Sequence, residues 1–173
     1  MVSALLYLRI RRHKMYIEKY WGKYIGGTDD SLTLLDYFAD KRKSEISLSE
    51  IFSDTGLDKL NWDFQESPEL GFTDRDGFEH DFYYAIDLVT DLAALMLECM
   101  VNGSFSLGEL MEDDENELTV RITFTDGEKA AMNRALADFV TDPTAYDLAE
   151  MVPDEDMLEM ARDCENLRRE LCE

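Results

Sequence analysis

Cysteine and histidine are both scarce in this sequence, and their scarcity limits the chemistry that the chain can perform. Its three cysteines, Cys99, Cys164 and Cys172, lack a metal-binding spacing, and an odd number cannot form a complete set of disulfides. Cys99 and Cys164 fall on apolar helical faces, so we interpret them as buried thiols of a reducing, cytoplasmic protein. Of the two histidines, His13 lies in the N-terminal extension, so only His80 is available for Ser-His-Asp or Cys-His catalysis. We therefore predict no enzyme activity, no metal and no cofactor.

Long apolar runs and nucleotide-binding loops are also missing. No run approaches the roughly 18–20 apolar residues that a membrane span requires. Residues 22–27 contain three glycines but lack the Lys-Ser/Thr ending of a phosphate-binding loop. Residues 74–77 begin like a calcium loop, yet they place glycine fourth, and a hairpin turn explains them better.

Basic residues are few compared with acidic ones. The chain has 17 Lys and Arg against 39 Asp and Glu, a net charge of −22. Four of the basic residues lie within residues 1–14, which hold no acid, so residues 15–173 carry 13 basic and 39 acidic groups, a net charge of −26. Such a surface repels nucleic acid and anionic membranes and suits a basic partner. Because 45% of residues are hydrophobic and 11% aromatic, we expect a folded protein and not an acidic disordered tail.

Two parts of different character make up the chain. Residues 1–14 place apolar residues before their basic ones, which is the reverse of a secretory signal, and we treat them as an N-terminal extension. Residues 15–173 predict a single α+β domain in which a small, mostly antiparallel sheet packs with several helices. The predicted strands are residues 15–22, 60–65 and 118–125, with a hairpin that turns at Asp76-Gly77. The predicted helices are residues 28–40, 47–55, 82–101 and 125–141 and a last helix after Pro153.

The segment over residues 82–101 is the most apolar part of the sequence. Asp87, Asp91 and Glu98 fall within one narrow sector of a helical wheel, and apolar residues cover the rest. This pattern predicts a central, largely buried helix.

The acidic residues that we expect to contact a partner come from two segments. One is a charged loop over residues 112–117, which could also be only a solvated loop or a weak cation-gathering run. The other is the start of the helix predicted at residues 28–40. The partner-binding candidates are Asp29, Asp30, Glu112, Asp113, Asp114, Glu115 and Glu117.

The segment from Trp21 to Tyr37, with the sequence WGKYIGGTDDSLTLLDY, resembles a known family. It is similar to the N-terminal region of small acidic immunity proteins of bacterial polymorphic-toxin and contact-dependent-inhibition systems. The resemblance is strongest over residues 15–37 and implies an α+β domain that neutralises a cognate toxin, expected to be a nuclease with a basic groove. It assigns no contact residue, and the oligomeric state stays open.

Two other functions are compatible with the same composition. The chain could be an acidic nucleic-acid mimic or adaptor that binds a basic host protein. It could also be a carboxylate-dependent hydrolase with a divalent metal, which would need a concave cluster of acids with raised pKa values. Immunity and mimicry both predict binding that weakens with salt, but only immunity predicts rescue from a specific toxin.

Overall fold

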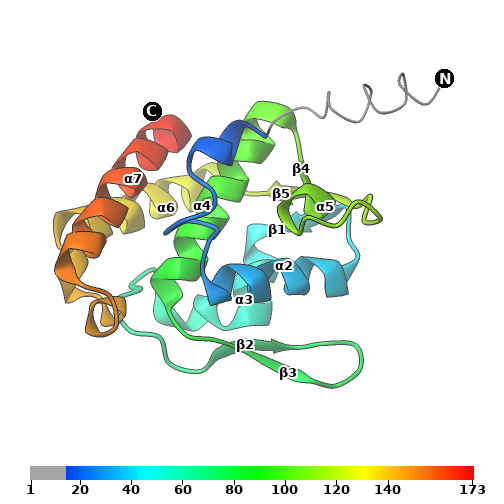
Figure 1. The fold of residues 1–173 in the computed structure, drawn as a ribbon, viewed down its shortest axis with the longest axis horizontal. Helices are drawn as coiled ribbons and strands as arrows, with labels where there is room; N and C mark the ends of the chain where they lie inside the picture. Colours follow the sequence, from blue (N-terminus) through cyan, green and yellow to red (C-terminus); the bar gives the residue numbers. More distant parts are fainter. Residues whose placement is uncertain (1–14) are drawn as a thin grey trace.

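The central element of this computed structural model, which describes residues 15–173, is the helix α4 (Ala85–Asn102). Every residue from Ala85 to Glu98 is buried, so the predicted central apolar helix is confirmed. Figure 1 shows α4 passing through the middle of the molecule, with other helices on both of its sides. The helix ends at Gly103, which adopts a positive φ of 87°.

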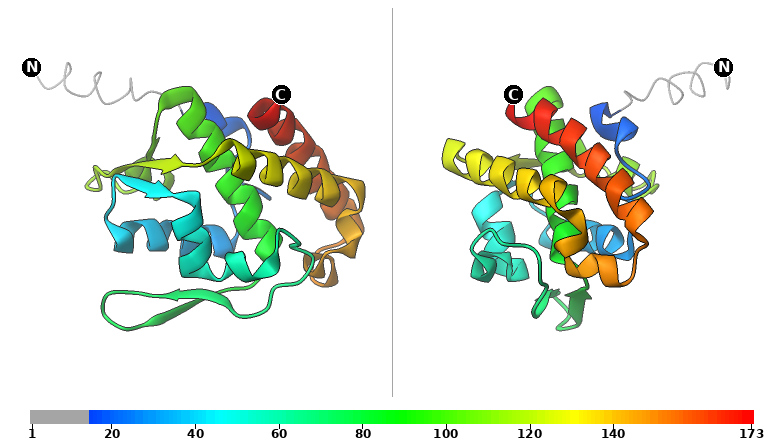
Figure 2. Two further views of the ribbon diagram at one scale, coloured as in Figure 1. Left: turned by 180° about the vertical axis from the view of Figure 1, so that it is seen from behind. Right: turned by 90° about the vertical axis from the view of Figure 1, so that its left-hand side faces the viewer.

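Four longer helices surround α4. Helices α6 (Asp126–Thr141) and α7 (Asp154–Cys172) pack against each other, and α7 also packs on α4. Helices α2 (Asp29–Lys41) and α3 (Leu48–Thr55) lie on the other side (Figure 2). The short helix α5 (Leu107–Leu110) contacts α2. The described residues also form four short 3-10 helices: η1 (Tyr16–Lys19), η2 (Leu57–Leu60), η3 (Pro143–Ala145) and η4 (Asp147–Glu150).

Side-chain caps explain why three of the predicted helices, α2, α3 and α6, begin where they do. The hydroxyl groups of Thr28, Ser47 and Thr125 each accept a hydrogen bond from the backbone N–H three residues later. Thr28 and Thr125 form complete capping boxes with Ser31 and Glu128. Each cap satisfies backbone donors that the first helical turn leaves unpaired.

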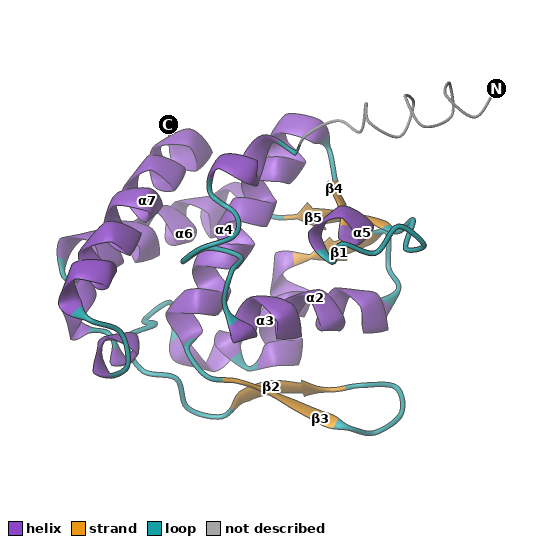
Figure 3. Ribbon diagram, in the orientation of Figure 1, coloured by secondary structure: helices purple, strands orange, loops and turns teal. Residues whose placement is uncertain are grey.

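The strands form two small sheets (Figure 3). In the first sheet, β5 (Thr119–Thr123) pairs in parallel with β1 (Glu45–Ser47) and antiparallel with β4 (Phe105–Ser106). In the second, β2 (Leu70–Thr73) and β3 (Glu79–Phe82) form the hairpin predicted around Asp76-Gly77. With two of three pairings antiparallel, the α+β prediction with a mostly antiparallel sheet is confirmed.

Two predicted strands are wrong. In place of a strand over residues 15–22, Tyr16–Lys19 form η1, because a helical turn brings the hydroxyl groups of Tyr16 and Tyr20 to the same carboxylate, that of Glu170. In place of a strand over residues 60–65, Asn61 and Trp62 adopt positive φ angles of 52° and 62°, which interrupt an extended chain. The apolar alternation there reflects loop side chains that pack on the core.

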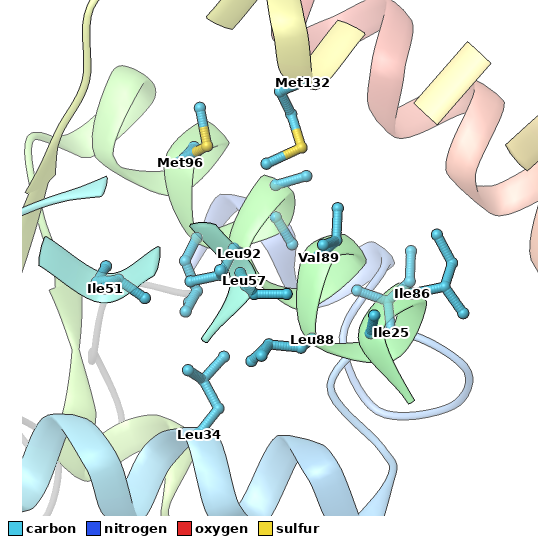
Figure 4. Close-up of a cluster of buried hydrophobic side chains, with 14 of the residues drawn as sticks. Ile25, Leu34, Ile51, Leu57, Ile86, Leu88, Val89, Leu92, Met96 and Met132 are labelled. Carbon is cyan, nitrogen blue, oxygen red and sulfur yellow. The ribbon is translucent and has the colours of Figure 1, made fainter. Parts of the chain in front are cut away.

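The hydrophobic core forms around α4. Figure 4 shows apolar side chains from α2, α3 and α6 converging on it. The fully buried members of this cluster include Leu34, Ile51, Leu57, Leu88, Leu92, Met96 and Met132. Cys164 is buried as predicted, whereas Cys99 is only half-buried beside β5, where its Sγ lies 3.7 Å from the carbonyl oxygen of Val120.

Candidate functional site

The acidic loop, residues 112–117, projects beyond α5 at one end of the molecule (Figure 1). Its five carboxylate residues, Glu112, Asp113, Asp114, Glu115 and Glu117, are all exposed. Hydrogen bonds donated by backbone N–H groups hold the loop in place. The N–H of Asp113 donates to the carbonyl oxygen of Gly108 at 2.8 Å, and the N–H of Leu118 donates to Oδ1 of Asn116 at 3.0 Å. The loop therefore presents its charges from a fixed backbone.

The other two contact candidates, Asp29 and Asp30, differ in their surroundings. Asp29 is exposed in the first turn of α2, whereas Asp30 is only 2% exposed. The carboxylate of Asp30 accepts the backbone N–H groups of Tyr83 and Tyr84 at 2.8 and 2.9 Å. Adjacent residues on a helix point about 100° apart, which explains the difference. Asp30 therefore anchors the segment that leads into α4, and the expectation that it is exposed is corrected.

The structure does not bring Asp29 and the acidic loop together. Phe38, near the end of α2, packs edge-on against Phe105, just before α5. The loop after α5 thus lies toward the C-terminal end of α2, and Asp29 lies at its start. At about 1.5 Å per residue, the helix separates these ends by roughly 18 Å. A partner that contacts both must cover the length of α2.

The segment that carries the family resemblance packs onto α4. Oδ1 of Asp91 accepts the N–H of Gly26 at 2.7 Å, and Oδ2 accepts the hydroxyl of Ser31 at 2.6 Å. A Cβ added to Gly26 would lie 2.1 Å from the ring of Trp21, so only glycine fits there. Ile25 is fully buried. Much of this motif therefore shapes the fold, and its exposed acids are Asp29 and Asp36.

The polar sector of α4 is buried instead of facing solvent. Oε2 of Glu98 accepts the N–H of Ile17 at 3.2 Å, so Glu98 and Asp91 fix two points of the N-terminal segment. Burial raises the pKa of Asp91 to about 7, although its bonds from Ser31 and Gly26 oppose the change. Burial, with the neighbouring charges of Asp91, Asp30 and Asp147, raises the pKa of Asp87 to about 8.

Carboxylates of α7 hold the same segment from its other side, which the sequence analysis does not predict. Nζ of Lys19 donates to Glu170 at 2.7 Å, and Nζ of Lys23 donates to Glu159 at 2.8 Å. The hydroxyl of Tyr24 donates to Glu159 as well. These partners lie more than 130 positions apart in the sequence, so no local pattern could reveal them.

Titratable groups elsewhere serve structural roles. His80 stacks on Phe72, and its Nε2 lies 2.8 Å from Oδ2 of Asp74 at the tip of the hairpin. Within residues 15–173, no group of three or more His, Cys, Asp or Glu side chains is arranged to hold a metal ion. Over the same residues, no helix is both long enough and apolar enough to cross a membrane.

Comparison with known proteins connects this arrangement to a family. The model of the family described as Immunity protein 68 matches residues 16–171, nearly all of the chain. The chain belongs to this family. The match confirms the predicted immunity-protein resemblance and extends it far beyond residues 15–37. No curated protein and no solved structure matches the chain.

This Immunity protein 68 domain also exposes large apolar side chains on α2 and beside β3. Leu32 is exposed on α2, and Phe78 and Tyr83 are exposed at the two ends of β3. Their exposure is not evident from the sequence, because the exposure of a large apolar residue depends on what the fold places over it. The sequence does contain one local signal for Tyr83. Side chains alternate between the two faces of a strand, so Tyr83 lies on the same outward face of the hairpin as Glu79 and Asp81.

Proposed function

We propose that this chain binds a cognate toxin in the cytoplasm and neutralises it through its acidic surface. The toxin we expect is a nuclease with a basic substrate groove. The observation that carries this proposal is the family match over residues 16–171, together with the net charge of −22. Neutralisation of this kind requires no catalytic residue in the immunity protein, since it acts by covering or locking the toxin.

The distribution of exposed carboxylates supports electrostatic capture. Exposed carboxylates lie toward both ends of α2, at Asp29 and in the acidic loop. A negative field steers a basic partner and can raise association rates by about 10- to 1000-fold at low salt. Protection depends on how quickly the toxin is captured, so rapid association serves this function directly.

Growth rescue tests the proposal. The chain is co-expressed with the toxin domain encoded beside its gene, and an unrelated toxin serves as the control. We expect rescue from the first toxin only. If the chain is folded and still does not rescue, the immunity proposal is overturned, and salt-sensitive capture of a basic host protein becomes the experiment for mimicry.

Charge reversal tests the contribution of the acidic loop. Changing Glu112, Asp113, Asp114 and Glu115 to lysine should slow association with the toxin by at least tenfold at low salt. The matched control changes four exposed acids in and around α6, η3 and η4 to lysine: Glu66, Asp138, Asp142 and Glu150. Both variants change the net charge equally. If both slow association to the same extent, the loop has no special role.

A further inference from the structure

The outward face of the β2–β3 hairpin has no partner within the described part of the chain. The inner face packs on the core through Leu70, Phe72 and Phe82, all of which are buried. The register pairs Gly71 with Asp81 and Thr73 with Glu79, and these residues alternate with the buried ones. The two strands thus present an outer face whose side chains contribute little to the core.

Tyr83 continues this outward face at the end where β3 leads into α4. Tyr83 is 65% exposed, and its backbone is held in place because its N–H donates to the buried carboxylate of Asp30 at 2.8 Å. A large ring presented from a fixed backbone loses little conformational freedom when a partner covers it. Tyrosines with these properties are common at the energetic centres of protein interfaces.

The surroundings of Tyr83 are acidic. The register that pairs Leu70 with Phe82 brings Glu69 beside Tyr83, and Asp81 lies two residues before Tyr83 on the same face of β3. Glu79 lies further along that face, and Asp29 precedes Asp30, whose carboxylate holds the N–H of Tyr83. Glu69, Glu79 and Asp81 also line a groove of about 560 Å³ beside the hairpin, which Tyr83 itself does not line. Among the described residues, none of these four carboxylates forms an ion pair with a cation. The arginine of the hairpin, Arg75, instead donates from Nε to the backbone carbonyl oxygen of Asp40 on α2 at 2.8 Å.

We propose that Tyr83 is the centre of the surface that holds the basic face of the toxin, an inference that rests on the proposed function. Lysine or arginine side chains of the toxin would lie against the Tyr83 ring and pair with Asp29, Asp81 and Glu79. A cation over an aromatic ring is favourable, and nearby carboxylates strengthen its attraction to the site. The acidic loop then speeds the encounter, and the Tyr83 surface keeps the complex together.

Binding kinetics separate these two roles. The full chain and the toxin domain encoded beside its gene are measured at low and at physiological salt. We expect Tyr83→Ala to raise the dissociation rate at least tenfold with little change in the association rate. Asp81→Lys should also raise the dissociation rate. Tyr83→Phe, which keeps the ring, should bind nearly as well as the wild type.

Phe78 provides the matched control. It lies on the same hairpin and is 68% exposed, but it pairs with Asp74 and shares the face of His80, opposite to Tyr83. Phe78→Ala should leave both rates unchanged. Thermal unfolding of each variant establishes that the fold is intact.

The possible outcomes distinguish the two proposals. If the wild-type chain neither binds nor rescues, the proposed function itself fails. If the wild type binds and Tyr83→Ala and Asp81→Lys dissociate at its rate, the Tyr83 surface is excluded and immunity stands. If Phe78→Ala weakens binding as much as Tyr83→Ala, the outward face is not specific and the inference is overturned.

Discussion

Replacing Asp87 by asparagine should make the protein less sensitive to rising pH. Asp87 is 4% exposed on α4 and faces other carboxylates instead of a cation. Burial, then the charges of Asp91, Asp30 and Asp147, raises its pKa from 3.8 to about 8. Asparagine has nearly the same shape and cannot ionise, so the substitution removes the titration and leaves the packing almost unchanged.

The size of the effect follows from the difference between folded and unfolded pKa values. Because the folded value is raised, the stabilisation is complete below the unfolded pKa of 3.8 and is lost as the pH rises through about 8. Between pH 6 and pH 8, Asp87 should therefore lower the free energy of unfolding by about 2 kcal/mol. Asp91, with a pKa near 7, should lower it by about 1 kcal/mol more over the same interval.

Urea unfolding at pH 6, 7 and 8, followed by tryptophan fluorescence, measures this dependence. The wild type should be most stable at pH 6, and Asp87→Asn should lose about 2 kcal/mol less than the wild type on going to pH 8. Asp76→Asn, at an exposed turn position, is the control and should behave as the wild type. If Asp87→Asn keeps the full wild-type dependence on pH, Asp87 is not the titrating group and the reasoning fails.

Two further predictions concern the local signals that shape the fold. Gly26→Ala should lower the free energy of unfolding by about 1–3 kcal/mol, because the added Cβ meets the ring of Trp21 at a φ of 78°. Gly77→Ala, where nothing lies within 4 Å of the added Cβ, should lower the free energy of unfolding less. If chemical unfolding shows the same loss of stability for both variants, the steric argument is contradicted. Thr125→Ala removes the cap of α6 and should lower the free energy of unfolding by about 1 kcal/mol in thermal unfolding, whereas Thr144→Ala, at an exposed site, should change little. A cap variant as stable as the wild type would show that the capping box of α6 does not stabilise the fold.

The elements that the sequence predicts correctly are those with a local cause. The caps at Thr28, Ser47 and Thr125 lie within three residues of the groups that they bind, so the sequence alone reveals them. The hairpin turn at Asp76-Gly77 is similarly local. The strands β1 and β4 and the helix α5 have two to four residues each, too few for a period to show.

The errors arise where distant residues decide the outcome. Tyr16 and Tyr20 have a high strand propensity, but the carboxylate of Glu170, about 150 positions away, favours a helical turn. Asp30 follows an exposed acid in sequence, yet it is buried because the amides of Tyr83 and Tyr84 need an acceptor. No sequence pattern near Asp30 could reveal those donors, so the candidate site could be predicted only in part.

The attachment of η1 to α7 has a consequence for the timing of folding. Glu170 binds residues that the ribosome makes about 150 positions earlier, and α7 follows every other helix in the chain. Contacts between such distant positions form late and slow the folding of a domain. Until α7 has been synthesised and has docked, one side of α4 and the tyrosines of η1 lack their partners. The packing of η1 and α4 is therefore completed only after the whole domain has been translated, so the last-made helix closes contacts with the first-made residues of the domain.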